Sequence, residues 1–505
     1  MKSEEFVNKL ILGDNLEKLK EIGDKSIDLI YADPPFFSNR NYEVIWGDEG
    51  EVRSFQDRWA GGMQHYILWL KERVMEMHRV LKDTGSIFLH CDWHANANIR
   101  VDILDKVFLS KNFRNEIIWK YFKPHSSNTN FPKDYDTIFF YSKSNKWTFN
   151  YDKILTEYDG KAVQRYDKTD EEGKKYKIYN NKDGTTRISY MKESGKPTSI
   201  FEIPFVQGTS KERIGYPTQK PEALLKRIIE CASNEGDIIL DPFVGGGTTI
   251  AVADKLNRRW IGIDQSVMAV KVTDLRLKKQ QDPLFPKPYE LHLRVHNFEF
   301  LRNQNAFEFE KWIIEQFGGI ANQKQRNDLG LDGKMPDNTP IQVKRSDNIG
   351  RNVIDNFLSA VQRNDEQLFE KNKAEGKPVG YIIAFSFGKG AIEEAARLRN
   401  KKHIIIELKK VNEIVPYGQG PKVSLTANEV DAANFEFEAY AEDAMFFSWD
   451  FNHNEKEGFK PDILIDKEGK QVRKFDPGKY QIAVEAVDKQ GLDSTDKIKI
   501  NVEDI

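Results

Sequence analysis

Residues 1 to about 280 alternate apolar, strand-like runs with amphipathic helical segments. In chain order these include "KLILGD", "NLEKLKEI", "SIDLIYAD", "YILWLKERVMEMHRVL" and "GSIFLHCD", and the pattern resumes at "PEALLKRIIECAS" and "DIILD". Such alternation is typical of α/β folds, in which each helix carries the chain back across a mostly parallel sheet. Residues 152–200 interrupt it with little periodicity, and we predict a loop-rich or small β insert there.

The rest of the chain divides into two further units. A charged, proline-punctuated linker, "KKQQDPLFPKP", separates residues 1–280 from a second α/β unit at 290–425. Near residue 430 the helical pattern stops, and "MFFSWDF", "GKYQIAVEAVD" and "DKIKINV" alternate with period two. That alternation predicts a small antiparallel β-sandwich over 430–505. A length of 505 residues agrees with roughly three domains.

The bulk composition favours a soluble protein of the cytoplasm. Apolar residues make up 39% of the chain and charged residues 31%, and the apolar runs are far shorter than the ~20 residues that cross a bilayer. The start "MKSEEFVNKL" lacks the apolar core of a signal peptide. Cys91 and Cys231 form no CxxC or Cys/His cluster, which argues against disulfides and structural zinc. We expect no membrane partner, and the sequence leaves the oligomeric state open.

Charge is distributed unevenly along the chain. The net charge is −3, yet residues 111–147 carry seven Lys/Arg against three acids, interleaved with ten aromatic side chains. Residues 441–505 carry ten Lys/Arg against fifteen acids. The first stretch suits contact with phosphates and the last does not. Ordinary strands with solvated lysines are the alternative explanation for the first stretch.

The stretch "SIDLIYADPPFF" ends a buried strand abruptly. Pro34 and Pro35 lack N–H donors and fix φ, so neither a central strand nor a helix interior continues through them. The corner leaves the Asp33 carboxylate, the Pro34 carbonyl and the Phe36 ring at the end of the strand. A simple strand-ending turn is the structural alternative for this motif seen alone.

A second stretch, "DIILDPFVGGGTTIAVADKLNRRWIGID", has the order strand, glycine-rich loop, helix, strand. The first strand ends at Asp241, Gly245 to Gly247 precede the helix, and Asp264 ends the second strand 17 residues after the last glycine. Glycines let a ligand approach the backbone, a helix N-terminus favours electronegative groups, and a strand-ending acid can hold ribose hydroxyls. This order predicts a site for an adenosine-containing cofactor.

Together, "DPPF" and "DPFVGGGT" resemble the amino-methyltransferases of DNA that use S-adenosylmethionine. The glycine loop follows "DPPF" by about 200 residues, which matches the permuted β-type order of that family. "LILGDNLEKL", "IFLHCDW", "NFRNEIIWKY" and "YPTQKPEALLKRII" are similar to other segments of it. The resemblance implies a Rossmann-like fold for residues 1–280, with a target-recognition insert at about 115–215 and double-stranded DNA as partner.

The same resemblance implies roles for individual residues. Asp33 and the Pro34 carbonyl would hydrogen-bond an exocyclic base amine, Pro35 would hold the corner rigid, and Phe36 would stack on a flipped base. Asp in the first place of the motif favours the 6-amino group of adenine, with the 4-amino group of cytosine as the alternative. Nine residues are implied as cofactor contacts: Asp14, Lys220, Pro221, Asp241, Phe243, Gly245, Gly247, Thr248 and Asp264.

A different constellation lies in "RNDLGLDGKMPDNTPIQVKRS". Asp332 stands at the expected start of one strand, and "IQVKR" places Gln342 and Lys344 on one face of the next, because residues i and i+2 share a side. A carboxylate, a polar side chain and a lysine on adjacent strands can hold Mg²⁺ and orient a water against a phosphodiester.

This pattern resembles the PD-(D/E)xK nucleases, in the methylated-adenine-restriction-like branch where Gln replaces the usual acid. The resemblance covers roughly residues 300–415 and implies catalytic and metal-binding roles for Asp332 and Gln342, a catalytic role for Lys344, and an additional metal-site acid in Glu310. The alternative is a degenerate nuclease fold kept for DNA binding or packing. Which methylation state of DNA such a nuclease prefers stays open.

The terminal segment, with "FFSWDF" and "DPGKYQIAVEAVDKQG", resembles a polycystic-kidney-type, immunoglobulin-like β-sandwich. Such modules bind or space other proteins, so a protein partner is expected here.

The leading hypothesis is a DNA adenine methyltransferase fused to a Mg²⁺-dependent restriction-type endonuclease. An orphan methyltransferase with an inactive nuclease-like module, a non-catalytic nucleic-acid-binding protein and an RNA substrate remain as alternatives. His90 and His94 lack a second ligand pair and are interpreted as structural.

Overall fold

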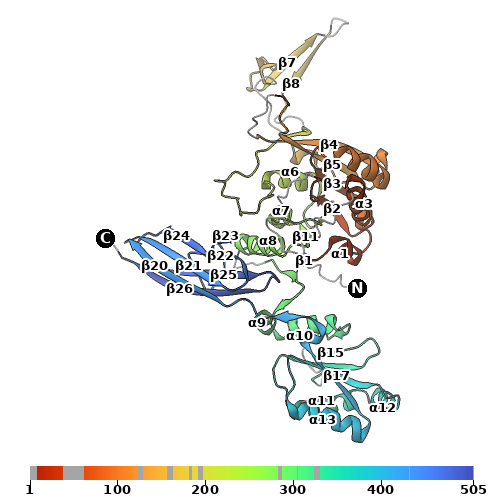
Figure 1. The fold of residues 1–505 in the computed structure, drawn as a ribbon. Coiled ribbons are helices and arrows are strands. Elements are labelled where there is room, and N and C mark those ends of the chain that lie inside the picture. Colours follow the sequence, from red (N-terminus) through yellow and green to blue (C-terminus); the bar gives the residue numbers. More distant parts are fainter. Residues whose placement is uncertain are drawn as a thin grey trace.

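The computed structural model describes residues 8–37, 62–122, 129–155, 163–180, 185–191, 197–282, 287–303, 305–322, 330–431 and 433–503. Figure 1 shows three parts in these ranges: a large central part, an α/β part below it and a β-rich part beside it. The aromatic "SNRNYEVIW" segment that follows the first catalytic motif lies outside the described residues.

The central part is built on a nine-stranded sheet with the order β12-β1-β11-β10-β2-β3-β5-β4-β9. The six strands from β12 to β3 are parallel, β5 runs antiparallel to both β3 and β4, and β9 is parallel to β4. The mostly parallel sheet is as the alternating sequence pattern predicts. The strands are β1 (Asn8–Leu12), β2 (Ile27–Ala32), β3 (Leu81–Cys91), β4 (Phe113–Lys120), β5 (Tyr135–Ser142), β9 (Ile200–Glu202), β10 (Ile238–Asp241), β11 (Arg259–Asp264) and β12 (Tyr289–His292).

Helices cover both faces of this sheet. One face is covered by α1 (Asn15–Glu21), α3 (Gly62–Val80) and η1 (Ile99–Leu109), and the other by α6 (Glu222–Ala232), α7 (Thr248–Lys255) and α8 (Val267–Gln280). The central strands are therefore buried on both sides, which explains why they are apolar runs and do not alternate. Short helical turns occur at α4 (Asn96–Asn98), η2 (Ser110–Asn112) and η3 (Tyr151–Lys153).

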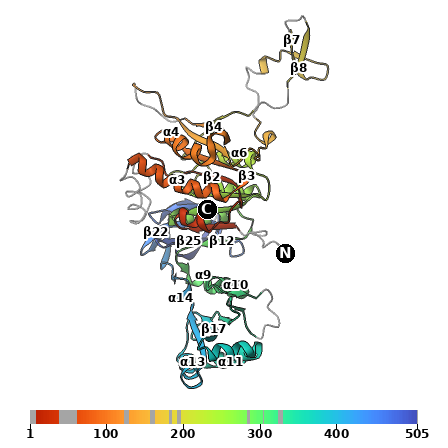
Figure 2. The same cartoon turned by 90° about the vertical axis from the view of Figure 1, so that its right-hand side faces the viewer.

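The insert forms a separate three-stranded antiparallel sheet. Its strands are β6 (Lys168–Thr169), β7 (Lys175–Asn180) and β8 (Thr186–Tyr190), in the order β6-β7-β8. Figures 1 and 2 agree that β7 and β8 project away from the body of the central part. The side chains of β7 and β8 are half-buried or exposed, so these two strands contribute no buried core.

The second part contains a five-stranded sheet with the order β14-β15-β16-β17-β18. Strands β14 (Ile320–Ala321), β15 (Gly333–Lys334) and β16 (Pro340–Lys344) are antiparallel neighbours, while β16, β17 (Pro378–Ala384) and β18 (Ile405–Lys410) are parallel. Its described helices are α9 (Phe298–Asn303), α10 (Ala306–Gln316), α11 (Arg351–Asn364), α12 (Glu366–Ala374), α13 (Lys389–Lys402) and α14 (Val411–Ile414).

The boundary between the first two parts differs from the one set by the linker. Strand β12 begins at Tyr289 and pairs with β1, so the large sheet extends into the residues that the sequence pattern assigns to the second unit. The chain then enters the second part through β13 (His296–Asn297), which pairs with β19 (Tyr417–Gly418) where the chain leaves it. Entry and exit thus lie side by side.

The third part consists of two antiparallel sheets that share an apolar core containing Phe437, Trp449 and Ile482. One sheet has the order β20-β21-β24 and the other β23-β22-β25-β26. We call this part the C-terminal sandwich. Its strands are β20 (Val423–Asp431), β21 (Asn434–Ala441), β22 (Ala444–Asp450), β23 (Ile463–Asp466), β24 (Lys470–Lys474), β25 (Gly478–Asp488) and β26 (Asp493–Val502).

Within the described ranges, the helices are too short or too polar to cross a lipid bilayer.

A glycine comparison tests how tightly α7 and α8 pack. Gly247 has φ +70°, and a Cβ added there would lie 2.4 Å from Thr273 Oγ1 of α8, whereas Gly236 has φ +81° with nothing within 4 Å of such a Cβ. Gly236→Ala carries only the backbone strain of about 1–2 kcal/mol. We expect Gly247→Ala to lower the thermal unfolding temperature further, because the strain and the clash add. Equal shifts in calorimetry would contradict this packing.

Candidate active site

The central part contains a pocket at the point where the winding direction of the large sheet reverses. The connection after β10 leads through α7 to β11 on one side, and the connection after β2 leads through α3 to β3 on the other. Open α/β sheets bind ligands at the carboxyl ends of the strands at such a reversal. Asp33 follows β2, Asp241 ends β10 and Asp264 ends β11, so three carboxylates reach the same edge.

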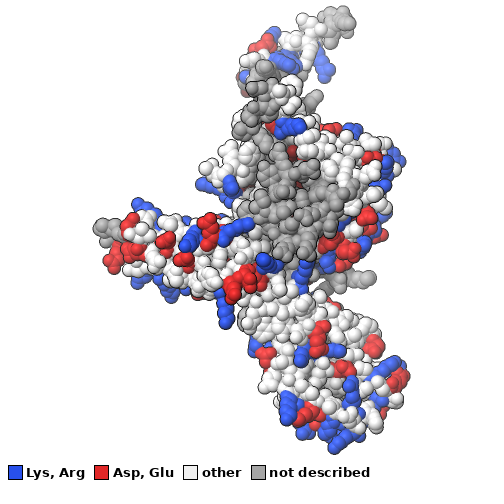
Figure 3. Space-filling view, viewed as in Figure 1, with Lys and Arg blue, Asp and Glu red and all other residues white. Residues whose placement is uncertain are grey.

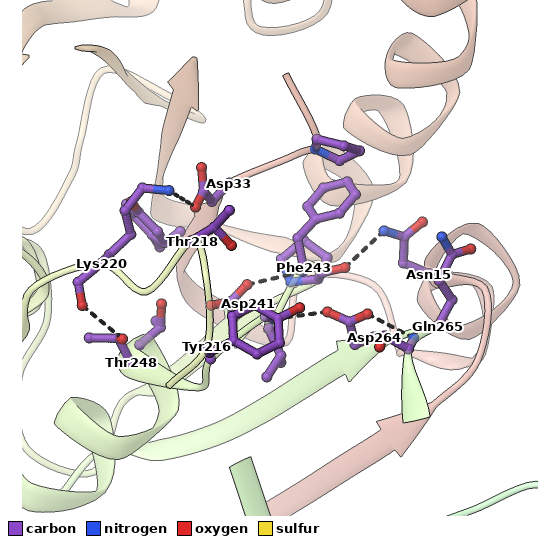
Figure 4. Close-up of a pocket in the computed structure, with 18 of the residues that line it drawn as sticks. Asn15, Asp33, Tyr216, Thr218, Lys220, Asp241, Phe243, Thr248, Asp264 and Gln265 are labelled. Atoms are coloured by element: carbon purple, nitrogen blue, oxygen red, sulfur yellow. Dashed lines mark hydrogen bonds and ion pairs between the residues drawn. The ribbon is translucent and has the colours of Figure 1, made fainter. Parts of the chain in front are cut away.

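Hydrogen bonds to two strand-ending acids fix the glycine loop. Asp264 Oδ2 accepts the Gly245 N–H at 2.9 Å, and Asp264 Oδ1 accepts the Ser266 N–H at 2.9 Å. Asp241 Oδ1 accepts the Phe243 N–H at 3.0 Å. The Asp264 carboxylate therefore joins the glycine loop to the start of α8 and fixes the position of this loop, whose Gly245 and Gly246 line the pocket. Figure 4 shows Asp264 with other residues of the lining.

The Asp33 corner is held from two sides. Lys220 Nζ forms an ion pair with Asp33 Oδ2 and lies 5.4 Å from the centre of the Phe36 ring. On the other side is His90, whose ring centre is 5.6 Å from that of Phe36 and whose Nδ1 is 3.9 Å from Asp33 Oδ1. The motif is thus clamped between a lysine from the loop before α6 and a histidine from β3.

His90 is fully buried within a network of polar side chains. Its Nδ1 lies 2.7 Å from the Tyr31 hydroxyl, and its Nε2 lies 3.3 Å from Asp136 Oδ2. Burial is the largest single influence and opposes ionisation of Asp136, but the hydrogen bond and charge of His90, the charge of Lys220 and the Tyr121 hydrogen bond together lower the Asp136 pKa. Burial and the neighbouring acids raise the Tyr31 pKa well above its ordinary value, so this tyrosine stays a phenol. The structural interpretation of His90 from sequence overlooked this position beside the motif.

The opposite wall comes from α1 and α3. Arg73 is buried, donates to Asp14 Oδ2 at 2.8 Å and to Asn15 Oδ1 at 2.6 Å, and stacks over Trp69 at 4.2 Å from its centre. Asp14 also caps α1 by accepting the Leu16 N–H at 2.8 Å. Arg73 and Trp69 lie on the same helix face without any motif, so the sequence offers no signal for them.

Most of the residues implied by the sequence line this pocket. Asp33 and Pro35 of the first motif do so, while Pro34 and Phe36 are outside the lining. Of the nine cofactor residues, Pro221 and Gly247 are outside it: Pro221 caps α6 and Gly247 caps α7. The lining also contains residues that sequence reasoning missed: Asn15, Tyr31, Trp69, Arg73, Tyr216, Thr218, Thr249, Gln265, Ser266 and Met268.

The pocket has an acidic electrostatic character. Its lining holds four carboxylates (Asp14, Asp33, Asp241 and Asp264) against two cations, Arg73 and Lys220, each of which is paired with an acid. Burial, together with the charges of Asp33 and Asp264, raises the Asp241 pKa to about 7. A cationic ligand is therefore favoured here, because it relieves the repulsion among these carboxylates.

The second constellation also comes together in the structure. Asp332 directly precedes β15, and its Oδ2 accepts the N–H of Val343, the residue between Gln342 and Lys344 on β16. Gln342 is buried and its Nε2 donates to the Gly330 carbonyl, while its Oε1 has no hydrogen-bond partner among the residues that the structure describes. Glu310 lies on α10 and is partly buried. Searched among the described residues, no cluster of three or more His, Cys, Asp or Glu suited to a metal ion occurs.

Comparison with known proteins assigns the central part to a family. A family model described as DNA methylase matches residues 27–274. The chain is 33% identical over 286 residues to the DNA adenine methyltransferase YhdJ of Escherichia coli, covering 53% of this chain and 82% of that protein. It is 30% identical over 308 residues to the type II methyltransferase M.HinfI of Haemophilus influenzae, covering 57% and 72%.

The chain belongs to the N6/N4 DNA methylase family.

Among solved structures, the PvuII cytosine-N4-specific DNA methyltransferase is 17% identical, with a TM-score of 0.37 over 54% of this chain and 85% of that one. The match of the methylase family ends before the second part and the C-terminal sandwich.

The raised pKa of Asp241 makes the stability of this methylase depend on pH. The folded protein holds the Asp241 proton up to about pH 7, whereas an ordinary Asp loses it near 3.8. Ionising buried Asp241 therefore lowers the free energy of unfolding. This destabilisation is absent below the ordinary pKa of 3.8, grows as the pH rises toward 7 and is complete above about pH 7. Asp241→Asn should therefore raise the unfolding temperature at about pH 8 and change it little at about pH 4. Scanning calorimetry without ligand measures both, and equal shifts at the two pH values would refute the assignment.

Proposed function

We propose that this protein transfers a methyl group from S-adenosylmethionine to the 6-amino group of adenine in double-stranded DNA. The observation that carries the proposal is that the Asp33 corner and the glycine loop, some 200 residues apart in sequence, line one acidic pocket at the reversal of the sheet. Named relatives agree with it, since one is a DNA adenine methyltransferase and another a type II methyltransferase.

The pocket residues fit this cofactor. Its sulfonium and ammonium groups are cationic, which matches a lining with four acids and two paired bases. Asp264 and the Gly245 backbone would hold the ribose side, Asp14 and Trp69 the adenine side, and Thr248 and Lys220 the methionine side. When bound, the cofactor supplies an electrophilic methyl group.

The chain's own residues would position the target amine. An exocyclic amine is a poor nucleophile because its lone pair is delocalised into the ring. Asp33 Oδ1 and the Pro34 carbonyl would accept its two N–H groups and turn the lone pair outward, while the Phe36 ring stacks on the base. Lys220 fixes the other oxygen of Asp33, so the carboxylate keeps one orientation. Asp33 is also the nearest acceptor for the proton that the amine releases.

The surface around the corner suits DNA. Strand β5 begins and β4 ends at the same edge of the sheet as the Asp33 corner, because Cys91 pairs with Thr137 and Lys120 with Tyr135. Phe122 and Phe131, in the connection between β4 and β5, are 79% and 94% exposed and so are available for stacking on bases. Lys and Arg side chains lie on the projecting β7–β8 sheet (Figure 3). The two longer strands of this sheet, β7 and β8, form an antiparallel pair, and a two-stranded β-ribbon can enter the major groove of DNA.

The adenine assignment is supported by the Asp in "DPPF" and by the adenine methyltransferase among the relatives. Methylation of the cytosine 4-amino group is the alternative within this family.

Loss of the first motif's carboxylate tests the methylation proposal. With mixed-sequence plasmid DNA and S-adenosylmethionine, the wild type should place methyl groups on adenines of one recognition sequence, mapped by single-molecule sequencing. Asp33→Ala should reduce the rate at least about a hundredfold, because positioning and electrostatic stabilisation are lost together. Asp28→Ala, on β2 but paired with Lys82 away from the pocket, is the matched control. Methyl groups on cytosine would favour the alternative, and methylation by Asp33→Ala at the normal rate would refute the role of Asp33.

A second activity, Mg²⁺-dependent cleavage of DNA, is proposed for the five-stranded part. The specific observation is the buried Gln342 Oε1, an acceptor without a donor among the described residues, near Asp332, which directly precedes the neighbouring strand β15. Buried acceptors are ordinarily satisfied, and a hard cation with oxygen ligands would satisfy this one. Asp332, Gln342 and Glu310 would hold the ion, and Lys344 would steady the attacking water. An inert nuclease-like module is the alternative.

Lysine substitutions on adjacent strands test the cleavage proposal. Lys344→Ala should abolish plasmid cleavage in Mg²⁺ and leave methylation intact, since the two sites share no residues. Lys334→Ala removes an exposed lysine of β15 that bonds only locally, to Asn338, and should cleave like the wild type. Wild-type protein that methylates but never cleaves, whether the DNA is methylated or not, would leave the inert module as the explanation.

A further inference from the structure

The C-terminal sandwich packs directly on the methylase part. Its β22 and β23 lie against α8 in Figure 1, and the two parts share one apolar cluster. The methylase contributes Ile214, Met268, Val272 and Leu275, and the sandwich contributes Phe446, Leu464 and Val487. All seven side chains are buried, which is the character of a lasting contact between domains.

One side of this contact is the loop that closes the cofactor pocket. Gly215 has φ +85°, and a Cβ placed on it would lie 3.6 Å from Ile465 Cβ of the sandwich. Its neighbours Ile214 and Tyr216 belong to or pack on the shared cluster and also approach the glycine loop, since a Cβ on Gly246 would lie 3.3 Å from each of them. Ile465 therefore lies against Gly215. The residue that follows Gly215 in the chain, Tyr216, packs on the glycine loop and lines the pocket.

This loop belongs to no strand pairing of the described residues. Between β9 and α6 it is held by individual bonds: Gln219 Nε2 donates to the Glu212 carbonyl at 2.6 Å, the Ile214 N–H donates to Gln219 Oε1 at 3.0 Å, and Lys220 pairs with Asp33. A segment without ladder bonds stays ordered only if its side chains are packed. For Ile214 and Tyr216, the sandwich supplies part of that packing.

The other side of the contact is α8, the helix whose first turn is bonded to Asp264. Met268 lines the pocket and also belongs to the shared cluster. Lys271, one turn further, is 2% exposed and forms an ion pair with Asp493 of the sandwich at 2.8 Å. Lys279 donates to the Asp462 carbonyl at 3.2 Å. A buried charge that loses its partner is strongly destabilising, so Lys271 keeps the sandwich docked.

We propose that the C-terminal sandwich is a positioning domain for the cofactor pocket. By packing on residues 214–216 and on α8, it holds Tyr216 and Met268 as pocket walls, so that the affinity for the cofactor depends on a domain outside the catalytic fold. This rests on the proposed use of S-adenosylmethionine. The partner of the sandwich is then the methylase part of its own chain, in place of the separate protein that its resemblance implies.

A charge placed at the contact tests the proposal in the full-length chain. Ile465→Asp should raise the dissociation constant of S-adenosylmethionine, measured by isothermal titration calorimetry, at least about tenfold, equivalent to ~1.4 kcal/mol. Val472→Asp places the same charge on β24 of the other sheet, where the side chain is 69% exposed, and should bind like the wild type. Steady-state kinetics should show a higher KM for the cofactor in Ile465→Asp with an unchanged KM for DNA. A merely damaged fold would change both.

Asp493→Asn removes the charge of the nearer acidic partner of Lys271, the one on the sandwich, and leaves Asp274 of α8 at 4.0 Å. It leaves the apolar contact unchanged and should weaken cofactor binding in the same direction. Wild-type affinity in both Ile465→Asp and Asp493→Asn would overturn the proposal, as would equal weakening by Val472→Asp. A wild-type protein that binds no S-adenosylmethionine would instead refute the proposed function, which this titration reveals before any variant is compared.

Discussion

The reversal of winding between β10 and β2 is the constraint on which the rest of the site depends. Parallel strands bring their carboxyl ends to one edge, so each strand that ends in an acid adds a carboxylate to the same pocket. Asp33, Asp241 and Asp264 meet there although they are far apart in sequence. Three acids at one edge repel one another. An ion pair with Lys220 stabilises Asp33, backbone N–H groups bond Asp241 and Asp264, and the pKa of Asp241 is raised. The remaining excess of carboxylates favours a cationic ligand in the pocket.

The sequence predicts the parts of this site that depend on strand ends and turns. "DPPF" and the glycine loop are local signals, since proline and glycine fix backbone geometry at their own positions. The walls carry no such signal. Arg73 and Trp69 belong to an ordinary amphipathic helix, and only the packing of α3 beside α1 brings them to Asp14. His90 stands in a short motif, but its position beside Phe36 depends on the pairing of β2 with β3. Distant contacts of this kind follow from sheet order, which periodicity does not determine.

The same reasoning explains why the linker does not mark the end of the first part. The prolines of the linker sequence predict a break in regular structure, but such a break need not be a domain boundary. Strand β12 follows it and returns to the edge of the large sheet beside β1, because the edge strand offers unpaired backbone groups. The five-stranded part is then inserted between β12 and the sandwich, with its entry and exit paired at β13 and β19. The five-stranded part is thus connected to the rest of the chain beside the short paired strands β13 and β19, which share few backbone hydrogen bonds.

The acidity of residues 441–505 acquires a second meaning in this arrangement. From the sequence it argues only against contact with DNA. In the structure one of these acids, Asp493, forms an ion pair with the buried Lys271 of α8. The same helix carries Lys278 and Lys279 at its end, where cations are favoured by the helix dipole, and Lys279 donates to the Asp462 carbonyl of the sandwich. The docked module thus contributes a negative charge to its contact with the methylase, and acidic side chains that stay exposed disfavour phosphate on that side. This agrees with the proposal that DNA approaches over the β4–β5 tip and the projecting β7–β8 sheet, away from the sandwich.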